Sequence, residues 1–529
     1  MRAPPARDML RPMFEVPLRL AVALTVTLVT VGCSVTAAPV SSGGVSSVRE
    51  SPSPPGGAGT AVKAGAADAT ATARNATVAE NARAGDPRWR IGDPGTEHEI
   101  EGFADRVSVL PGEGFRLYVS TTAGRYTARA FRMGWYGGAG ARQVWKSAEL
   151  PGVRQAPPRT VAATRTVTAA RWRPGPEVDT SGWPEGSYLI RLDAATGGRR
   201  YVPLTVRSAS TRGRLVVVNA VTTWQAYNDW GGRSLYKGPG GFADRSRAVS
   251  FDRPYDTSGA RLFLDMERDA IQLAERDGLP LSYVTDLELD RDPHVLDGAR
   301  GLVSLGHDEY WSDHMRHTVE AARAHGTNIA FLGANAVYWR IRFAATPLGP
   351  GRLVVCHKDA AEDPGTALWR ESGKPENSLT GPMYDCFPSE SAYVVTRPGN
   401  WIFKGTGVRR GTAFPGMAGV ETDKVVAGAP RPMEVLSVSP VDCGGRATVA
   451  HSAYYTAPSG AAVFDSGTMR WVCAMRGARC GHGVTARAGA FVRRATRNLL
   501  RVFAAGPAGR SHPAEDNLES LGLAGPAPR

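Results

Sequence analysis

Arg214 to Ala220 (RLVVVNA) forms a continuous apolar run, which is the pattern of a strand buried on both faces of a parallel sheet. The strand-like segments LSYVTDLEL, GLVSLGHDE and NIAFLGAN follow it, and helical spacings of three and four lie between them, as from Phe263 to Leu273. Strands that alternate with helices build βαβ crossovers. The sequence therefore predicts an α/β fold with a doubly wound sheet, which we assign to residues 211–506.

Upstream of this run, from Trp89 to about Ser208, apolar and polar residues alternate with period two. Short strands such as FRLYVST are separated by the turn-forming segments PGEG and SGWPEG, a pattern typical of a β-sandwich. We predict an immunoglobulin-like β-sandwich domain over residues 87–210, with no catalytic constellation of its own. Residues 507–529 are polar and rich in Pro and Gly, and we expect a flexible tail there.

The N-terminus has the features of an export signal. Basic residues precede the apolar segment Leu20 to Val31, which is too short to span a bilayer comfortably. The segment ends in TVGCS, which resembles a bacterial lipobox, although Thr30 stands where a leucine is usual. We therefore predict a signal peptide at residues 1–33 with lipidation at Cys33, and the alternative is a plain signal peptide cleaved nearby. The protein is expected to be secreted and lipid-anchored at the cell surface of a bacterium.

Residues 34–86 consist of small and polar residues with almost no large apolar side chain. Such a composition cannot bury enough surface to offset its ordering entropy. We predict a disordered linker that separates the folded part from the anchor.

Export permits disulfides. With Cys33 set aside, five cysteines remain, and their spacings fit no zinc pattern because no C-x-x-C is present. We predict the bridges Cys356–Cys386 and Cys443–Cys473, with Cys480 left free.

The net charge of +13 could indicate an anionic partner. However, the basic residues are mostly arginines scattered singly, without a long basic run or an aromatic-basic motif. We therefore do not expect nucleic acid as a partner, and the sequence leaves the oligomeric state open.

Polar and aromatic residues gather where the predicted strands end. The stretch SLGHDEYWSDH follows one strand, and GANAVYWR and VVVNAVTTWQAYN mark two others. In open α/β sheets, ligands bind beyond the carboxyl ends of the strands. We predict that His307 and Glu309 transfer protons and that Asn335 and Asn219 orient a substrate carbonyl. The residues expected to line the substrate site are Trp224, Trp311, Tyr338 and Trp339.

The residue types at these strand ends limit the chemistry. No cysteine lies between residues 34 and 355, so a thiol nucleophile is excluded at these strand ends. Ser304 and Ser312 remain, but neither sits in the G-x-S-x-G motif of a serine nucleophile. Glutamate and tyrosine oxygens suit a hard ferric ion, which favours metal-assisted hydrolysis. A purely structural interpretation stays open, in which Tyr310 and Trp311 pack at the start of a helix and the acidic residues favour its N-terminus.

Four segments together resemble a known family. LVSLGHDEYWS, NIAFLGANAVYWRIRF, VVVNAVTTWQAYNDWGG and AAVFDSGTMRW, spread between about Arg214 and Gly506, are similar to the large (β) subunit of N,N-dimethylformamidase, and above all to secreted bacterial proteins with this C-terminal domain. The resemblance implies a glutamine-amidotransferase-like fold and an amidohydrolase with one iron ion (Fe3+), held by two tyrosines and one glutamate. It also implies a separate small subunit, and no segment of this chain resembles one.

The resemblance assigns the iron ligands only in part. Tyr310 matches one tyrosine, while Tyr227, Tyr255 and Tyr283 compete for the second place, with Tyr227 preferred. Glu362 is the candidate for the glutamate and Glu371 is the reserve. The chain departs from the family at Asp308, where a proline is expected.

Two hypotheses follow. The first is a secreted, lipid-anchored hydrolase of C–N (amide) bonds that acts on a small amide or a glycan-like substrate with an iron site. The second is a non-catalytic cell-surface protein on the same fold that binds a glycan or a peptide. They differ in whether a second tyrosine and a carboxylate meet the Tyr310 hydroxyl around one point.

Overall fold

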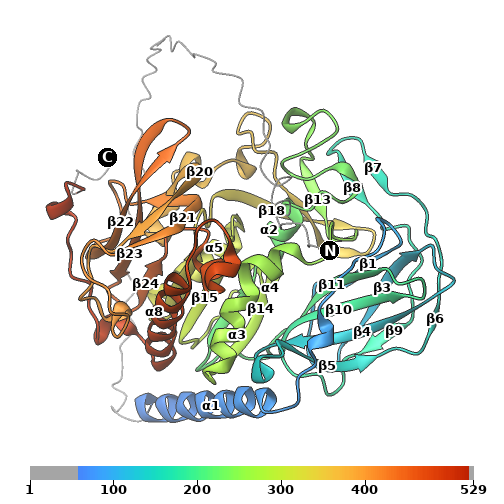
Figure 1. Ribbon diagram of the computed structural model, residues 1–529, viewed down its shortest axis with the longest axis horizontal. Helices are drawn as coiled ribbons and strands as arrows, with labels where there is room; N and C mark the ends of the chain where they lie inside the picture. Colours follow the sequence, from blue (N-terminus) through green and yellow to red (C-terminus); the bar gives the residue numbers. More distant parts are fainter. Residues whose placement is uncertain (1–57, 524–529) are drawn as a thin grey trace, which may run out of the picture. The chain divides into compact units, whose positions relative to one another are not determined.

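The structure, a computed structural model, describes residues 58–523. The predicted signal peptide, the lipidation site at Cys33 and the first part of the predicted linker lie outside the described residues. The chain is rich in β-structure, with several sheets and some helices (Figure 1). Within residues 58–523, no helix is both long enough and apolar enough to cross a membrane.

The second part of the predicted linker is helical, so the prediction of disorder was wrong there. Helix α1 spans Ala58–Asn81 and contacts helix α3 (Arg268–Arg276). Its end is fixed by Asn81, whose side-chain oxygen accepts hydrogen bonds from the backbone N–H groups of Trp135 (2.8 Å) and Tyr136 (3.2 Å). Composition alone missed this helix because alanine, which is abundant here, has the highest helix propensity, and because its partners lie far away in the sequence.

Residues 100–206 form two sheets that share one core. One sheet has the order β1-β3-β9 and the other β2-β11-β10-β4-β5, with β6 beside β4. Their core includes Phe115, Trp183, Tyr188 and Val202. The strands are β1 (Ile100–Ala104), β2 (Ser108–Val109), β3 (Gly114–Thr121), β4 (Arg125–Met133), β5 (Ala141–Lys146), β6 (Leu150–Pro151), β9 (Glu177–Asp179), β10 (Gly186–Ala194) and β11 (Arg199–Val206), with a separate hairpin β7 (Arg159–Val161) and β8 (Thr166–Thr168).

The next sheet has seven strands in the order β14-β12-β15-β17-β24-β23-β22. The five strands from β14 to β24 pair in parallel, and β23 and β22 are antiparallel. Parallel strands of this kind need crossover connections, as the helical spacings of the sequence indicated. The strands are β12 (Leu215–Asn219), β14 (Leu281–Thr285), β15 (Gly301–Gly306), β17 (Asn328–Gly333), β22 (Met433–Cys443), β23 (Arg446–Thr456) and β24 (Ala462–Asp465).

Two groups of helices pack against this sheet. Helices α3, α7 and α8 contact one another, and α2, α4 and α5 form a second group (Figure 1). The second group shares a core with the sheet that contains Val216, Leu302, Phe331 and Trp311. The remaining helices are α2 (Val221–Ala226), α4 (Asp286–Arg291), α5 (Asp313–Ala324), α6 (Asn377–Thr380), α7 (Trp471–Ala474) and α8 (Ala486–Ala505), and a π-helical turn (Phe263–Glu267) precedes α3.

Smaller sheets complete the fold around the carboxyl ends of the parallel strands. A four-stranded sheet has the order β13-β19-β18-β16, and β20 pairs with β21. These strands are β13 (Ala248–Ser250), β16 (Tyr310–Ser312), β18 (Trp339–Thr346), β19 (Gly349–Val355), β20 (Met383–Val394) and β21 (Ala413–Lys424). Strand β21 carries the Glu421 side chain.

The disulfides differ from those predicted. The bridges are Cys386–Cys443 and Cys473–Cys480, while Cys356 is buried and free. The predicted pairs Cys356–Cys386 and Cys443–Cys473 were wrong because β20 packs against β22 and places Cys386 beside Cys443, with their Cα atoms 5.4 Å apart.

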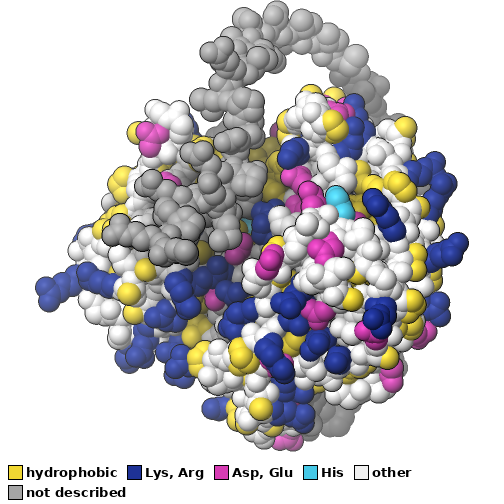
Figure 2. All heavy atoms as spheres, turned by 45° about the vertical axis from the view of Figure 1, so that its right-hand side comes forward, with side chains coloured by type: hydrophobic (Ala, Val, Ile, Leu, Met, Phe, Trp, Pro, Cys, Tyr) yellow, Lys and Arg dark blue, Asp and Glu magenta, His cyan; other side chains and the backbone are white. Residues whose placement is uncertain are grey.

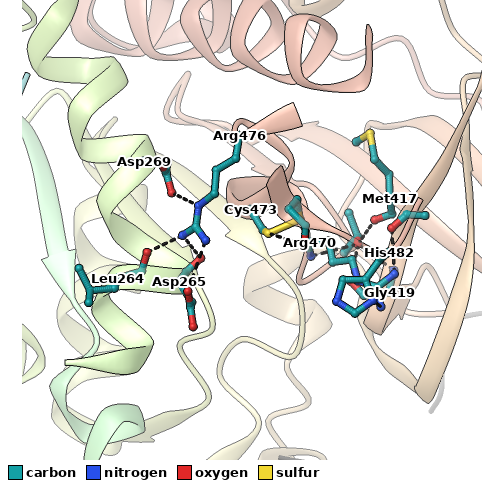
Figure 3. The surroundings of a disulfide bond; sticks show 12 residues. Leu264, Asp265, Asp269, Met417, Gly419, Arg470, Cys473, Arg476 and His482 are labelled. Atoms are coloured by element: carbon teal, nitrogen blue, oxygen red, sulfur yellow. Dashed lines mark hydrogen bonds and ion pairs between the residues drawn. A yellow bond between two sulfur atoms is a disulfide. The ribbon is translucent and has the colours of Figure 1, made fainter. Parts of the chain in front are cut away.

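The Cys473–Cys480 loop is joined to the helical layer by one arginine (Figure 3). The Arg476 guanidinium contacts Asp269 at 2.6 Å and Asp265 at 3.3 Å and donates to the carbonyl of Leu264. These contacts attach the short disulfide loop to the π-helical turn and to α3.

A buried ion pair joins the sheets of residues 100–206 to helix α3 beside the parallel sheet. Arg132 on β4 lies 2.6 Å and 2.9 Å from the two carboxylate oxygens of Glu275 on α3, and both side chains are almost fully buried. Tyr283 on β14 also donates to Glu275. The attraction to Glu275 holds the pKa of Arg132 well above its usual value despite burial.

We expect Arg132→Met to destabilise the protein by about 3–5 kcal/mol, because it leaves the Glu275 carboxylate buried without its counter-charge. Urea unfolding measures the effect. Arg129→Met is the matched control, since Arg129 lies on the same strand and pairs with Asp193 in a partly exposed position, and it should cost less than about 1 kcal/mol. Equal costs for the two variants would contradict the role assigned to Arg132.

Candidate functional site

The candidate site lies where β15 and β17 end. Gly306, the last residue of β15, has φ 61°, and a Cβ there would come within 2.4 Å of the Met266 carbonyl oxygen. Only glycine fits this turn. The next residues, His307 to Glu309, are buried, and the Glu309 backbone N–H donates to the Thr223 hydroxyl (3.0 Å). The turn thus directs the Glu309 side chain towards the ends of β12 and β17.

Glu309 is the centre of the cluster. Its side chain is almost fully buried, and its two carboxylate oxygens accept hydrogen bonds from four other residues. The Tyr227 hydroxyl donates to one oxygen (2.8 Å), which also lies 3.3 Å from His307 Nε2. The Tyr236 hydroxyl donates to the other oxygen, and Asn335 Nδ2 lies 3.4 Å from it. A carboxylate with this many donors is held in its ionised form.

A second carboxylate, Glu421 on β21, lies on the far side of His307 and Asn335. Asn335 Nδ2 donates to Glu421 at 2.8 Å, and His307 Nδ1 lies 4.0 Å from the same carboxylate. The Asn335 backbone N–H donates to Asp423 (2.9 Å). Asn335 adopts φ 57°, an uncommon backbone conformation that this hydrogen bond helps to maintain. Glu309 and Glu421 therefore face each other across one imidazole and one amide.

Besides the Asn335 amide oxygen, two buried polar atoms in the cluster have no hydrogen-bond partner within residues 58–523. One is the Tyr310 hydroxyl, and the other is Lys358 Nζ. The Lys358 stem is partly exposed, but its Nζ is buried 3.2 Å from the centre of the Tyr236 ring and 4.5 Å from that of Trp339. Buried polar atoms without partners are rare in proteins, so both atoms are candidates to meet a ligand.

The charges in the cluster shift one another's protonation. Burial disfavours the imidazolium form, but the charges of Glu421 and Glu309 raise the pKa of His307 to about 9. Burial alone would raise the pKa of Glu309, yet His307 and Lys358 hold it below its usual value. Burial and the neighbouring Glu309 raise the pKa of Glu421 to about 7. An ionised carboxylate (Glu309), an imidazolium (His307) and a carboxyl group with a pKa of about 7 (Glu421) form a set suited to proton transfer.

The three phenols resist ionisation in the absence of a counter-cation. Burial first, and then the charge of Glu309, raises the pKa values of Tyr227, Tyr236 and Tyr310 well above the usual value. Burial also lowers the pKa of Lys358 to about 7, against the opposing charge of Glu309.

Partly exposed aromatic side chains border the cluster. Tyr338 packs edge-on against both Trp339 and Tyr384 at centroid distances of 5.2 Å and 5.0 Å. Trp339 Nε1 lies 3.3 Å from the Tyr236 hydroxyl. These rings place Tyr338 and Trp339 at the edge of the site, where a ligand could contact them.

Several predicted residues lie elsewhere. Trp311 is fully buried in the core below the sheet, where its indole N–H donates to Asp308 (2.8 Å), so it does not line a site. Trp224 is buried as well, and its indole N–H donates to Glu267 (2.7 Å). It lines a small pocket together with Tyr227 and Tyr255.

Asn219 does not face the cluster. Its amide oxygen accepts hydrogen bonds from Ser187 on β10 and Thr205 on β11, both at 2.8 Å, and its amide nitrogen donates to Glu267 (2.7 Å). Because all its polar atoms are occupied in this way, Asn219 joins these two strands to Glu267 and cannot orient a substrate.

The structure separates Glu362 from the cluster. This residue is partly exposed and pairs with Arg247 and His357. The carboxylate that Tyr227 and Tyr236 contact is that of Glu309. Among the tyrosines considered, Tyr227 reaches Glu309, while Tyr283 contacts Glu275.

Sequence reasoning missed Tyr236, Lys358 and Glu421. Tyr236 lies nine positions after Tyr227 in a Gly-rich loop, and only its aromatic character signalled it. Lys358 and Glu421 come from the segment in which the strand periodicity weakens, and their convergence on Glu309 depends on the packing of β19 and β21.

The donors available to a metal are mostly oxygen atoms. Within the described residues, no three or more His, Cys, Asp or Glu side chains gather as they would around a metal ion. A metal at this place would therefore need tyrosine oxygens beside Glu309. The donor set of one carboxylate and two adjacent phenols, together with the orphaned Tyr310 hydroxyl, fits a hard cation such as a ferric ion.

Buried carboxylates, an imidazole and phenols lie together at the carboxyl edge of the parallel strands, where ligands bind in such sheets, and they are groups that can transfer protons. The family model described as "N,N-dimethylformamidase beta subunit-like, C-terminal" matches residues 127–484, more than half of the chain. The chain belongs to this family, as its sequence motifs indicated, and this membership points to a hydrolase. The match begins within β4, upstream of the boundary that we predicted at residue 211.

Other comparisons add little. No curated protein matches the chain. One solved structure, a cycloisomaltooligosaccharide glucanotransferase of Paenibacillus sp. complexed with cycloisomaltoheptaose, shares 14% identity with a TM-score of 0.14. The match covers 24% of this chain and 17% of that chain, so it has no bearing on fold or function.

The ionic contacts of His307 predict a pH-dependent stability. Its pKa in the folded protein, about 9, exceeds the value of 6.5 expected for the unfolded chain. The stabilisation is therefore fully present below pH 6.5 and is lost as the pH rises through 9. In metal-free protein, we expect the destabilisation by His307→Gln to be larger at pH 6 than at pH 9.5 by about 3 kcal/mol, as measured by urea unfolding.

His317→Gln is the control for this experiment, because His317 is exposed on α5. It should change the stability by less than about 0.5 kcal/mol at both pH values. A His307→Gln cost that is independent of pH would show that folding leaves the pKa of His307 unchanged and would contradict this prediction.

Proposed function

We propose that this protein is a metal-dependent hydrolase of carbon–nitrogen bonds in amides, with its active site at Glu309. The observation that carries the proposal is the convergence of Tyr227, Tyr236, His307 and Asn335 on this one buried carboxylate. Membership of the N,N-dimethylformamidase beta subunit-like family supports it. We further propose that the five parallel strands and their helices are the glutamine-amidotransferase-like, doubly wound fold of this family, and that the preceding sheets are an immunoglobulin-like sandwich.

We assign the metal ligands to Glu309, Tyr227 and Tyr236. The phenols of both tyrosines already lie against the Glu309 carboxylate, and Tyr310 stands next to Tyr236 with a ring-centroid distance of 6.4 Å. When bound there, a ferric ion supplies Lewis-acid polarisation of a carbonyl oxygen or of water. The phenols would lose their protons on binding such a cation, which would overcome the rise in their pKa that burial causes.

The remaining residues would handle protons and position the substrate. Amide hydrolysis joins a water oxygen to the carbonyl carbon and breaks the C–N bond, so one proton must leave water and one must reach the departing nitrogen. Glu421, with a pKa of about 7, can accept the first proton and return it. Asn335 holds Glu421 in place through its amide N–H, and His307 stabilises the negative charge between the two carboxylates.

Lys358 is the group that we propose for the substrate oxygen. Its buried Nζ lacks an acceptor among the described residues, and the aromatic faces of Tyr236 and Trp339 confine it to the edge of the cluster. A carbonyl or carboxylate oxygen of a small substrate would supply the missing hydrogen bond. The partly exposed rings of Tyr338 and Trp339 would contact the rest of that substrate.

We also propose that the protein is exported and held at the bacterial membrane by a lipid on Cys33. The support is the basic, apolar and lipobox-like order of the N-terminal sequence. Incorporation of a radiolabelled fatty acid in cells, lost in Cys33→Ser, tests this part separately from catalysis.

The metal ligands are tested by analysing purified residues 57–529 for bound iron and for a visible phenolate-to-iron absorption band. We expect near-stoichiometric iron and a coloured protein. Glu309→Gln, Tyr227→Phe and Tyr236→Phe should each reduce bound iron at least tenfold, because each removes a ligand. Glu362→Gln is the matched control and should leave both readouts unchanged, since Glu362 pairs with Arg247.

The opposite pattern, in which Glu362→Gln removes the metal and Glu309→Gln keeps it, would overturn the ligand assignment. A protein that stays colourless and metal-free after reconstitution with iron would favour the non-catalytic glycan- or peptide-binding hypothesis instead.

The proton-transfer roles are tested with the iron-loaded protein on a panel of formamides and acetamides. Glu421→Gln and His307→Asn should lower kcat about 10²–10⁴-fold while iron content stays the same, because they remove groups that move or stabilise protons. Amine release measured by fluorescent derivatisation reports the rate. Unchanged kcat in Glu421→Gln would exclude this residue as the proton acceptor.

A further inference from the structure

The outer surface of α8 is strongly cationic. The helix carries five arginines and no acidic residue, and the spacings 0, 6, 7, 10 and 14 from the first arginine place all five on about one third of the helix circumference. The opposite side of α8 is apolar and buried, with Phe491, Leu499 and Phe503 in the core. The five residues are Arg487, Arg493, Arg494, Arg497 and Arg501.

Neighbouring segments extend this surface. Arg276 at the end of α3, Arg479 in the Cys473–Cys480 loop, and Lys404, Arg409 and Arg410 in the loop before β21 are all exposed. That loop runs beside α8, because Asn498 donates to the carbonyl of Lys404 (2.8 Å) and Phe414 stacks on Phe491 at 4.4 Å. We call these residues and the α8 arginines the α8 basic face.

Negative charge on the α8 basic face is scarce. Asp277 contacts both Arg497 (2.6 Å) and Arg501 (3.4 Å). In the described part of the chain, the other basic side chains of this face form no ion pair with a carboxylate. Burial, followed by repulsion from Arg276, Arg497 and Arg479, lowers the pKa of Arg493, which shows how closely these charges lie. Basic side chains also gather on the lower left of the face drawn in Figure 2.

Like charges without counter-charges repel one another on one rigid surface, and binding of an anionic partner reduces the electrostatic free energy of this repulsion. We propose that the α8 basic face docks onto a membrane surface rich in anionic lipid headgroups. Helix α8 is rigid and holds its arginines on one side, which suits a flat charged surface. The apolar side of the helix is occupied by the core, so the docking is electrostatic and does not insert the helix.

The N-terminal sequence agrees with this partner. The export signal in the sequence would bring the protein to a membrane, where anionic headgroups are the nearest polyanionic surface.

Sedimentation with lipid vesicles tests the proposal. Residues 57–529 form a compact unit that contains all described cores, so this fragment, which lacks any lipid, is used. We expect it to bind vesicles of phosphatidylcholine with 30% phosphatidylglycerol at about 50 mM salt, and to be released at about 500 mM salt. It should not bind vesicles of phosphatidylcholine alone.

Two triple variants, each of which removes three positive charges, distinguish the contribution of the α8 basic face to vesicle binding from that of the overall net charge. Arg409→Gln, Arg410→Gln and Arg494→Gln together should weaken binding at least tenfold. Arg154→Gln, Arg171→Gln and Arg173→Gln, which change exposed arginines of the sandwich region, should weaken it less than twofold. Circular dichroism confirms that both variants are folded, as expected for exposed positions.

Two results would overturn the proposal. The first is an absence of binding to the anionic vesicles, or an equal loss for both triple variants, which would leave only a general effect of net charge. The second is tighter binding of the same face to a duplex DNA of 30 base pairs at matched salt, which would identify a nucleic-acid surface. Amide hydrolysis by iron-loaded protein in solution is measured in parallel, so that failure of membrane docking is distinguishable from failure of the proposed activity.

Discussion

Burial of one carboxylate, Glu309, governs how the site is built. An ionised carboxyl group in the interior costs several kcal/mol unless donors and positive charges surround it. Here the donors come from separate segments: Tyr227 after α2, Tyr236 in the following loop, His307 at the end of β15 and Asn335 at the end of β17. Each segment is therefore fixed relative to the others by the same demand for hydrogen bonds.

The arrangement also separates two acidic groups in function. Glu309 is held below its ordinary pKa by His307 and Lys358 despite burial, whereas burial and Glu309 itself raise the pKa of Glu421. Paired carboxyl groups whose environments push their pKa values apart commonly divide the work of binding and of proton transfer. His307 and Asn335 lie between the two groups and transmit the influence of one to the other.

The sequence predicted those features that follow from local patterns. The apolar runs at β12, β15 and β17 and the helical spacings between them indicated parallel strands, and the strand-end rule located His307, Glu309 and Asn335 near one another. The sequence did not predict the features that depend on tertiary packing. Glu362 is a carboxylate in a plausible loop, but Arg247 holds it at the surface, and Glu421 is brought in by β21 from a segment with weak periodicity. The disulfide pairs were missed because the packing of β20 against β22 brings Cys386 to Cys443, which leaves Cys473 to pair with Cys480 seven residues later.

Asn219 has consequences for how such a chain can be divided. Its side chain is shared between Ser187 and Thr205 on one side and Glu267 on the other, and Arg132 and Glu275 make a second buried link close by. The amino-terminal sheets thus belong to the same compact unit as the part of the chain that carries the Glu309 cluster. The family match, which starts inside β4, follows the same unit. A boundary drawn at residue 211 would cut through the hydrogen-bond network around Asn219. Recombination in evolution would therefore have to move the segments before and after residue 211 together, or replace the partners of Asn219 at the same time.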